Sequence, residues 1–143
     1  MKSDYSPDNR ELTLAFNQHC PDTPNQTDKQ PFLIPIRLGF LDEKGSSVKL
    51  SSNGESELVI EITESAQELV FKGLDANCVP SLLRSFSAPV KISYPYSISE
   101  LAHLMKHDSD GFNRWDAGQK LATKILQLQV NNFIPVSYTH LTL

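Results

Sequence analysis

The residues best suited to chemistry in this sequence are two histidines four positions apart. His103 and His107 lie in the run HLMKH, and histidines at i and i+4 of a helix can bind zinc from one face. The metallopeptidase motif H-E-x-x-H has this spacing, and its glutamate is the general base. Here Leu104 takes the place of the glutamate, and a third ligand is absent. We therefore predict no catalytic residue and no metal ligand, and we expect both histidines on a solvated or interface face of a helix.

Other chemical motifs are missing as well. The sequence has no glycine-rich phosphate loop, no G-x-S-x-G motif and no pair of carboxylates that would flank a cleft. Its two cysteines, Cys20 and Cys78, lie far apart in the sequence and do not make a disulfide framework. We expect both to be free thiols, and we predict no cofactor in this chain.

Composition and charge indicate a globular protein. With 143 residues the chain is long enough for one hydrophobic core, and 39% of its residues are hydrophobic. A formal net charge of −4 argues against a nucleic-acid partner, because such proteins usually carry a basic face. No apolar run reaches the roughly 18 residues of a transmembrane helix, and residues 1–10 lack the apolar region of a secretory signal. We therefore expect no membrane partner and a cytoplasmic location.

Alternating apolar residues predict short strands in the first two thirds of the chain. Leu12, Leu14 and Phe16 alternate with other residues, which is the pattern of a half-buried strand. The further expected strands are residues 32–41, 48–50, 58–63, 69–71, 79–90 and 90–94. Residues 1–10 are polar and are expected to be coil. About seven short strands separated by turns predict a mostly β chain, folded as an antiparallel β-sandwich.

The run VPSLLRSFSAPV, residues 79–90, is the most distinctive part of the sequence. Pro80 and Pro89 interrupt its apolar residues, which predicts a buried strand with a bulge or bend. Arg84 in the middle needs a partner, because a lone buried charge is unfavourable. We select four candidate interdomain contacts, with the two arginines as candidates for ion pairs across a domain boundary: Arg84, Phe86, Arg114 and Trp115. A tryptophan in the position of Trp115 is more often part of a core.

After Pro95 the apolar period becomes helical. Ser97 and Glu100 have the spacing of a capping box, which predicts a helix start, and Asp110 can cap a second helix. The apolar stripe of the second helix consists of Phe112, Trp115, Leu121, Ala122, Ile125 and Leu128. Nothing that follows would cover this stripe, so we interpret the two helices as an incomplete unit.

Three runs carry a family likeness. They are DKQPFLIPIRLGFLDEKG (28–45), VPSLLRSFSAPVKISYPYS (79–97) and LAHLMKHDSDGFNRWDAGQKLA (101–122). Together they resemble bacterial aminopeptidase N, the alanyl aminopeptidase branch of the zinc metallopeptidases. The likeness covers roughly residues 5–130, in order and with similar spacing.

The resemblance implies a division of the chain. Residues 1–96 would be an immunoglobulin-like β-sandwich domain, and residues 97–135 the start of a truncated C-terminal helical domain. Residues 136–143 continue neither helix, and we expect them to be a non-native tail. The zinc motif and the other catalytic residues of the family lie in earlier domains, so no catalytic or metal residue is carried over to this chain.

The resemblance also implies a function. The chain would be a non-catalytic interdomain segment of a zinc-dependent aminopeptidase N, which removes N-terminal amino acids from peptides. Its partners would be the catalytic and helical domains of the same polypeptide, with zinc and peptide substrates bound by the parent enzyme. One alternative is a free-standing β-sandwich that binds a protein partner and has no enzymatic activity. A second is a small metal enzyme that uses His103 and His107.

Overall fold

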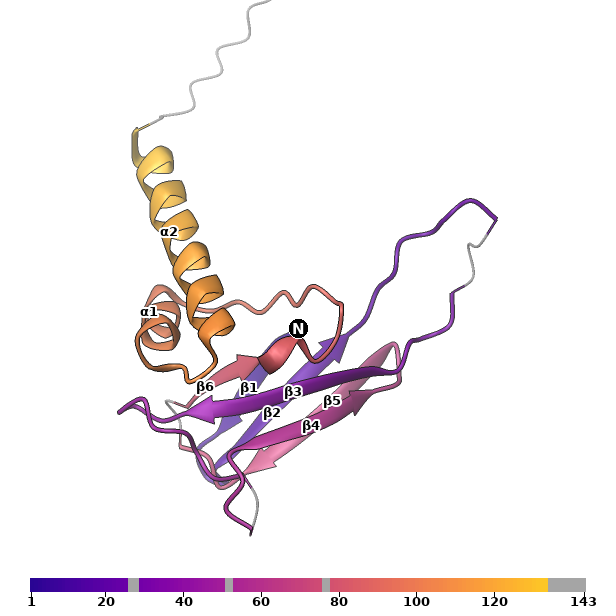
Figure 1. Cartoon of the computed structure of the whole chain (residues 1–143), viewed down its shortest axis with the longest axis horizontal. Helices are drawn as coiled ribbons and strands as arrows, with labels where there is room; N and C mark the ends of the chain where they lie inside the picture. The colour runs from indigo at the N-terminus through magenta and orange to yellow at the C-terminus, as the bar shows by residue number, and fades with distance from the viewer. Residues whose placement is uncertain (26–28, 51–52, 76–77, 134–143) are drawn as a thin grey trace, which may run out of the picture.

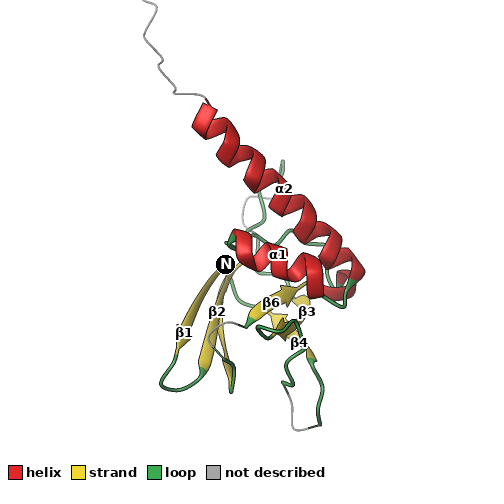
Figure 2. Ribbon diagram, turned by 90° about the vertical axis from the view of Figure 1, so that its left-hand side faces the viewer, coloured by secondary structure: helices red, strands yellow, loops and turns green. Residues whose placement is uncertain are grey.

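Two small antiparallel sheets and two helices make up the structure (Figures 1 and 2). The computed structural model describes residues 1–25, 29–50, 53–75 and 78–133. Within these residues the elements follow in the order β1 (Lys2–Ser6), β2 (Glu11–Asn17), β3 (Ile34–Leu41), β4 (Glu57–Ile62), β5 (Ala66–Lys72), β6 (Val79–Leu82), the 3-10 turn η1 (Arg84–Phe86), α1 (Ile98–His107) and α2 (Gly111–Phe133).

The six strands form two sheets that pack on each other. One sheet has the order β1-β2-β5 and the other the order β4-β3-β6. In the first sheet Leu14 of β2 pairs with Leu69 of β5, and in the second Leu38 of β3 pairs with Leu82 of β6. Phe40 of β3 and Phe71 of β5 meet edge to face across the sheets, with their ring centroids 5.1 Å apart. The predicted antiparallel sandwich is therefore confirmed, with six strands among the described residues.

Four local predictions are wrong. The expected strand 79–90 ends at Leu82, and the 3-10 turn η1 follows it. Residues 2–6 form β1 rather than coil, because their backbone pairs with β2 and the Tyr5 hydroxyl donates to the carbonyl of Leu74. Residues 48–50 are not a strand, and only Ser47 bridges to Leu41. Residues 90–94 are irregular, because the prolines on either side of this segment cannot donate to a ladder.

The hydrophobic core is continuous from the sheets to the helices. Leu14, Leu38 and Phe40 are fully buried between the sheets. Leu101 and Leu104 of α1 belong to the same cluster of buried side chains, together with Tyr96 and Ala117. Burial of this apolar surface is the main favourable contribution to folding, so the first helix is held by the same core as the strands.

The helix starts follow the predicted capping. The Glu100 backbone N–H donates to Ser97 Oγ over 3.1 Å, and the Ser97 backbone N–H donates to Glu100 Oε2 over 2.6 Å. The Asn113 backbone N–H donates to Asp110 Oδ1 over 2.9 Å, which caps α2. From its base α2 extends away from the sandwich (Figure 1). Most of its predicted apolar stripe is exposed, including Ile125 and Leu128.

Both cysteines, Cys20 and Cys78, are free thiols, as predicted. Neither α1 nor α2, the helices of the described part, is long and apolar enough to cross a membrane. The predicted tail, residues 136–143, lies outside the described residues.

Candidate functional site

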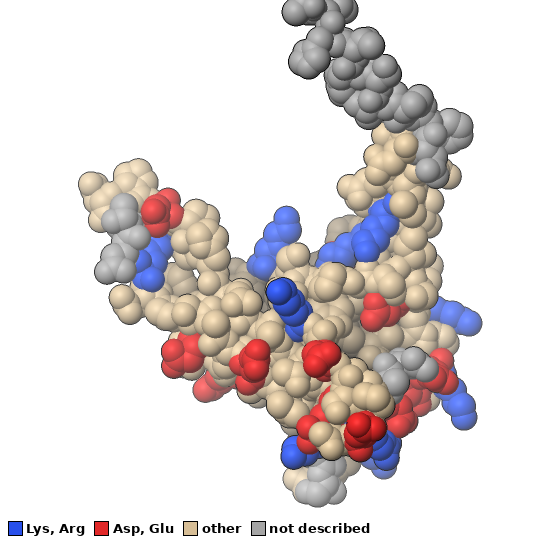
Figure 3. All heavy atoms as spheres, turned by 180° about the vertical axis from the view of Figure 1, so that it is seen from behind, with Lys and Arg blue, Asp and Glu red and all other residues tan. Residues whose placement is uncertain are grey.

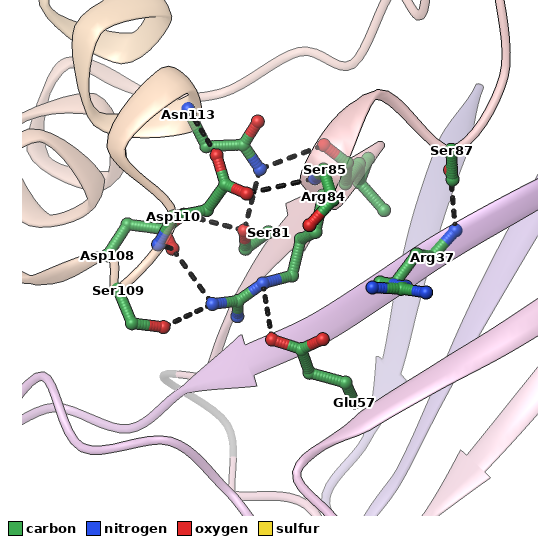
Figure 4. A network of polar contacts seen from close by, with 11 residues as sticks. Arg37, Glu57, Ser81, Arg84, Ser85, Ser87, Asp108, Ser109, Asp110 and Asn113 are labelled. Carbon is green, nitrogen blue, oxygen red and sulfur yellow. Dashed lines mark hydrogen bonds and ion pairs between the residues drawn. The ribbon is translucent and has the colours of Figure 1, made fainter.

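A polar cluster with a buried centre joins the sandwich to the helices (Figure 4). It forms where β6 ends and the two helices meet, and it draws on segments that are far apart in the sequence. We call it the joint, and define it by the residues Glu57, Ser81, Arg84, Ser85, Asp108, Ser109, Asp110 and Asn113.

Arg84 is the centre of the joint. The arginine is only 2% exposed, and its guanidinium contacts both the sandwich and the segment that joins the helices. Nε lies 3.1 Å from Glu57 Oε1 on β4, a close ion pair that lacks the alignment of a hydrogen bond. Nη2 lies 3.3 Å from Asp108 Oδ1 and also donates to the Ser109 hydroxyl. Because burial removes water from the arginine, these partners must supply the compensation that water would otherwise give.

Asp108 provides the matching charge at the end of α1. It is 1% exposed, and its backbone N–H donates to the Leu104 carbonyl over 2.9 Å at the C-cap of the helix. Its Oδ2 accepts a 2.6 Å hydrogen bond from the Ser81 hydroxyl, and its Oδ1 accepts one of 2.9 Å from the Asp110 backbone N–H. Two hydrogen bonds and the ion pair with Arg84 therefore hold one carboxylate, which fixes the turn between the helices against β6.

Asp110 and Asn113 attach the start of α2 to the turn after β6. Asp110 Oδ2 accepts from the Ser85 backbone N–H over 2.9 Å, and the Asn113 amide donates to the Leu82 carbonyl over 3.0 Å. Partial burial favours a higher pKa for Asp110, but the N–H donors of Asn113 and Ser85 and the charge of Arg84 together hold that pKa below its ordinary value. The carboxylate of Asp110 is therefore well stabilised in its charged form.

The turn held by these contacts is strained. Leu83, Ser85 and Phe86 all have left-handed backbone angles, with φ of 56°, 55° and 51°. Such a conformation costs of order 1–3 kcal/mol for each residue that is not glycine. A pair of aromatic rings in contact contributes only about 0.5–1.5 kcal/mol. The contact between Phe86 and Phe112 therefore cannot offset the strain of these three residues by itself. The polar contacts of the joint are the interactions that hold this turn in place.

The four predicted interdomain residues fall in two environments. Arg84 lies buried in the joint, where it pairs with Asp108 across the junction of strands and helices. Phe86 and Trp115 are exposed by 66% and 59%, and both lie next to Phe112. The assignment of Trp115 to the core is therefore wrong, because α2 turns this face away from the sandwich. Arg114 is exposed, and within the described residues it has no ion-pair partner.

The two histidines pack against a turn of the sandwich. His103 Nε2 lies 2.8 Å from the carbonyl oxygen of Asp42, and the rings of His103 and His107 are 4.9 Å apart. A methyl group added at Gly45 would meet the His107 ring at 2.2 Å, so this glycine allows the close contact. In the part of the chain that the structure describes, no three His, Cys, Asp or Glu side chains come together to hold a metal ion. The described residues therefore do not form a three-ligand zinc centre.

The sequence interpretation missed Ser81, Asp108 and Asn113 as parts of the joint. The run HDSDGFN did contain a signal, since two aspartates and a serine next to a helix start are suited to capping and to local hydrogen bonds. Nothing local indicated that one of these aspartates would meet the buried arginine.

Comparison with known proteins agrees with this architecture. Residues 1–95 match the model of the DUF3458 family, described as a domain of unknown function with an Ig-like fold. The chain belongs to the DUF3458 family. Residues 98–141 match a second model, DUF3458_C, described as a domain of unknown function with ARM repeats.

The curated relatives of this chain are much longer proteins. This chain is 38% identical over 131 residues to aminopeptidase N of Escherichia coli, which covers 91% of the chain and 15% of that protein. It is 36% identical over 121 residues to aminopeptidase N of Haemophilus influenzae, which covers 84% of the chain and 14% of that protein. The DUF3458 chain thus spans about one seventh of the length of these relatives and matches an interdomain segment of a peptidase.

A solved structure shares the fold. The crystal structure of Legionella pneumophila aminopeptidase A in complex with aspartic acid matches 98% of this DUF3458 chain with a TM-score of 0.70 and 28% identity. The match covers 14% of that protein. The resemblance to aminopeptidase N is therefore confirmed, as is the immunoglobulin-like sandwich followed by helices.

Proposed function

We propose that this chain is a non-catalytic interdomain segment of a zinc-dependent aminopeptidase N that removes N-terminal amino acids from peptides. The support is its similarity to segments of two aminopeptidase N proteins, together with the absence of a three-ligand metal cluster among the described residues. Zinc and peptide substrates would be bound by other domains of the parent polypeptide. We include in this proposal the division at residues 96 and 97, the non-native tail 136–143 and a cytoplasmic location, for which two free thiols are suitable.

The buried pair of Arg84 and Asp108 is the observation that carries the proposal. A protein that bears a large helical domain on a small sandwich needs a junction that does not bend freely. Here the arginine after β6 holds the C-cap of α1, and the Tyr96 hydroxyl donates to the Pro80 carbonyl over 2.7 Å. The amino group of Lys124 on α2 also donates to the Tyr96 carbonyl. These contacts tie the linker and both helices to one strand.

The exposed stripe of α2 supports a helical partner in the same polypeptide. Leu126, Leu128 and Val130 are each more than half exposed, and residues 98–141 match a family described as ARM repeats. In helical repeats each pair of helices buries its apolar face against the next pair. We therefore propose that further helices of the parent enzyme cover this face.

The test combines the chain alone with a chimera. The purified 143-residue chain should not hydrolyse an alanine anilide substrate, with or without added zinc. Replacing the matched segment of Escherichia coli aminopeptidase N by this chain should give an active enzyme, and Arg84→Ala in the chimera should lower its thermal stability and its activity. Robust, chelator-sensitive activity of the chain alone would contradict the proposal. A chimera whose thermal stability and activity are unchanged by Arg84→Ala would also contradict the proposal, and would favour a free-standing binding module.

A further inference from the structure

We infer that three exposed aromatic residues at the joint form a docking site for an acidic, apolar segment elsewhere in the parent polypeptide. This aromatic patch consists of Phe86, Phe112 and Trp115. The inference rests on the proposed function, because it assigns the occupant to the same polypeptide, but it concerns a different surface from the apolar stripe farther along α2.

The patch is held in place by the joint beneath it. The rings of Phe86 and Phe112 are tilted by 42° with their centroids 3.9 Å apart, and the ring centroid of Phe112 lies 5.7 Å from that of Trp115. Phe86 takes this position only because the turn before it is left-handed, and Asp110 holds that turn through the Ser85 backbone N–H. The buried network thus displays a large aromatic side chain to solvent, which leaves 66% of Phe86 exposed.

Strain and exposure together point to binding. Strained backbone persists where a function requires the conformation, and exposed aromatic clusters on a soluble protein mark interaction surfaces. Tryptophan and arginine are the residue types most enriched at the centres of interfaces. Trp115 of the patch is of the first type, and 59% of it is exposed.

A groove next to the patch gives the occupant its shape. It has a volume of about 290 Å³ and runs between the 83–92 segment and α2, with Phe86 and Phe112 in its wall. Most of its other lining is apolar, so it suits an extended apolar segment rather than a flat surface. Figure 3 shows basic side chains around the lower part of α2, whereas most acidic side chains lie over the strands.

Charge decides the chemistry of the occupant. Lys91 lines the groove and has no ion-pair partner among the described residues. The other charges of the groove, Asp116 and Lys120, neutralise each other over 2.6 Å. The lining of the groove therefore has a net positive charge, which favours a segment with a carboxylate beside its apolar residues. The matched segment is about one seventh of the length of the relatives, so other parts of such a polypeptide could supply the occupant of the groove.

Hydroxyl-radical footprinting tests the docking site on the isolated chain and on the chimera with the Escherichia coli enzyme. Phe86 and Trp115 should oxidise readily in the isolated chain and several-fold more slowly in the chimera. Val70 is the reference, because it is 51% exposed and lies on β5, in the sheet that does not contain β6. Lys91→Glu should restore oxidation of Phe86 in the chimera, and Lys106→Glu, at another exposed cation, should not.

The same experiment separates the two proposals. Protection of Leu126 and Leu128 reports on the helices that the proposed function requires, while protection of Phe86 and Trp115 reports on the docking site. If the leucines are protected and the aromatic residues oxidise as in the isolated chain, the docking site is overturned and the proposed function stands. If none is protected in a folded chimera, both are overturned.

A second measurement covers a chimera that does not fold. Trp115 is the sole tryptophan of the chain, so labelling with 5-fluorotryptophan gives one fluorine NMR signal. Adding the two flanking pieces of the Escherichia coli enzyme should shift this signal, and Phe86→Ala should remove the shift. An unchanged signal would overturn the inference. A signal that shifts with the concentration of the chain alone would also overturn it, because the occupant would then be a second copy.

Discussion

Arg84 and Asp108, 24 positions apart in the sequence, form a buried ion pair in which Nη2 lies 3.3 Å from Oδ1. The arginine follows the last strand and the aspartate ends the first helix, so this pair joins the two structural classes of the chain. Each partner has further contacts, since Glu57 flanks the arginine and Ser81 donates to the aspartate. The pair therefore acts as the centre of a network rather than as a single bond.

Removing the aspartate should be severe. Asp108→Ala leaves the guanidinium of Arg84 buried without its main counter-charge, and breaking a buried pair in this way typically costs about 3–5 kcal/mol. The free energy of unfolding from urea denaturation measures the loss. Asp75→Ala is the matched control, because its ion pair with Arg10 is exposed and worth about 0–1 kcal/mol. Equal effects of the two substitutions would show that the buried pair has no special role.

Substitution of a glycine tests the histidine contact. Gly45 has φ of +82°, and a Cβ there would meet the His107 ring at 2.2 Å, so Gly45→Ala should destabilise through both strain and collision. Gly54 has φ of +83° with nothing within 4 Å, so Gly54→Ala should cost only the backbone strain of about 1–2 kcal/mol. Adding His107→Ala to Gly45→Ala should recover part of this cost, because the ring contacts at 2.2 Å and 2.3 Å are removed while the Cβ of residue 107 stays 2.6 Å from the new methyl group. A thermal denaturation series decides this, and no recovery in the double variant would show that the two residues are not in contact.

Acid should weaken the same contact. Desolvation lowers the pKa of His107 from its ordinary value of 6.5, and the charges of the nearby His103 and Lys106 lower it further. The carboxylate of Asp42 opposes this shift. A lowered histidine pKa means that the unfolded chain binds the proton more tightly. The stabilisation is therefore complete above pH 6.5 and is lost as the pH falls through the folded-state value. Denaturation curves above and below pH 6.5 should show this loss in the wild type and a smaller one in His107→Ala. Identical curves would contradict the assignment.

The strained turn predicts an order of stabilities at one position. Ser85 has φ of 55° and donates only through its backbone, so Ser85→Gly removes the strain while it keeps the hydrogen bond to Asp110. Glycine also loses more entropy on folding, so we expect a net change between zero and about 1 kcal/mol of stabilisation. Ser85→Val should destabilise by more than about 1 kcal/mol, because a β-branched residue tolerates this region poorly. A valine variant as stable as the glycine variant would show that the turn is not left-handed.

Asp110 should contribute both a helix cap and an anchor for the turn. Asp110→Ala removes the acceptor for the backbone N–H groups of Asn113 and Ser85, and loss of a cap typically costs about 0.5–2 kcal/mol. Because the folded-state pKa of Asp110 is lowered, its contribution is present above its ordinary value of 3.8 and is lost as the pH falls below it. Asp110→Asn should keep much of the cap without this pH dependence. A wild type and an alanine variant that lose stability in parallel below pH 3.8 would refute the prediction.

Features that depend on neighbouring residues could be predicted from the sequence. The alternation of Leu12, Leu14 and Phe16 identified β2, because the side chains of a strand alternate between two faces. The capping box of Ser97 and Glu100 located the start of α1, because both of its hydrogen bonds join residues three apart. The family resemblance likewise followed from continuous runs of residues, which a single sequence displays in full.

Features that depend on distant partners were decided only by the tertiary structure. The sequence required a partner for Arg84, but packing selected Glu57 and Asp108 from the many carboxylates of the chain. The polar side chains of residues 2–6 predicted coil. These residues form a strand because their backbone pairs with that of β2. Trp115 has the character of a core residue, yet it is exposed because the contacts of the joint set the direction of α2. In each case the deciding energy comes from groups brought together by the fold, and local patterns carry no record of them.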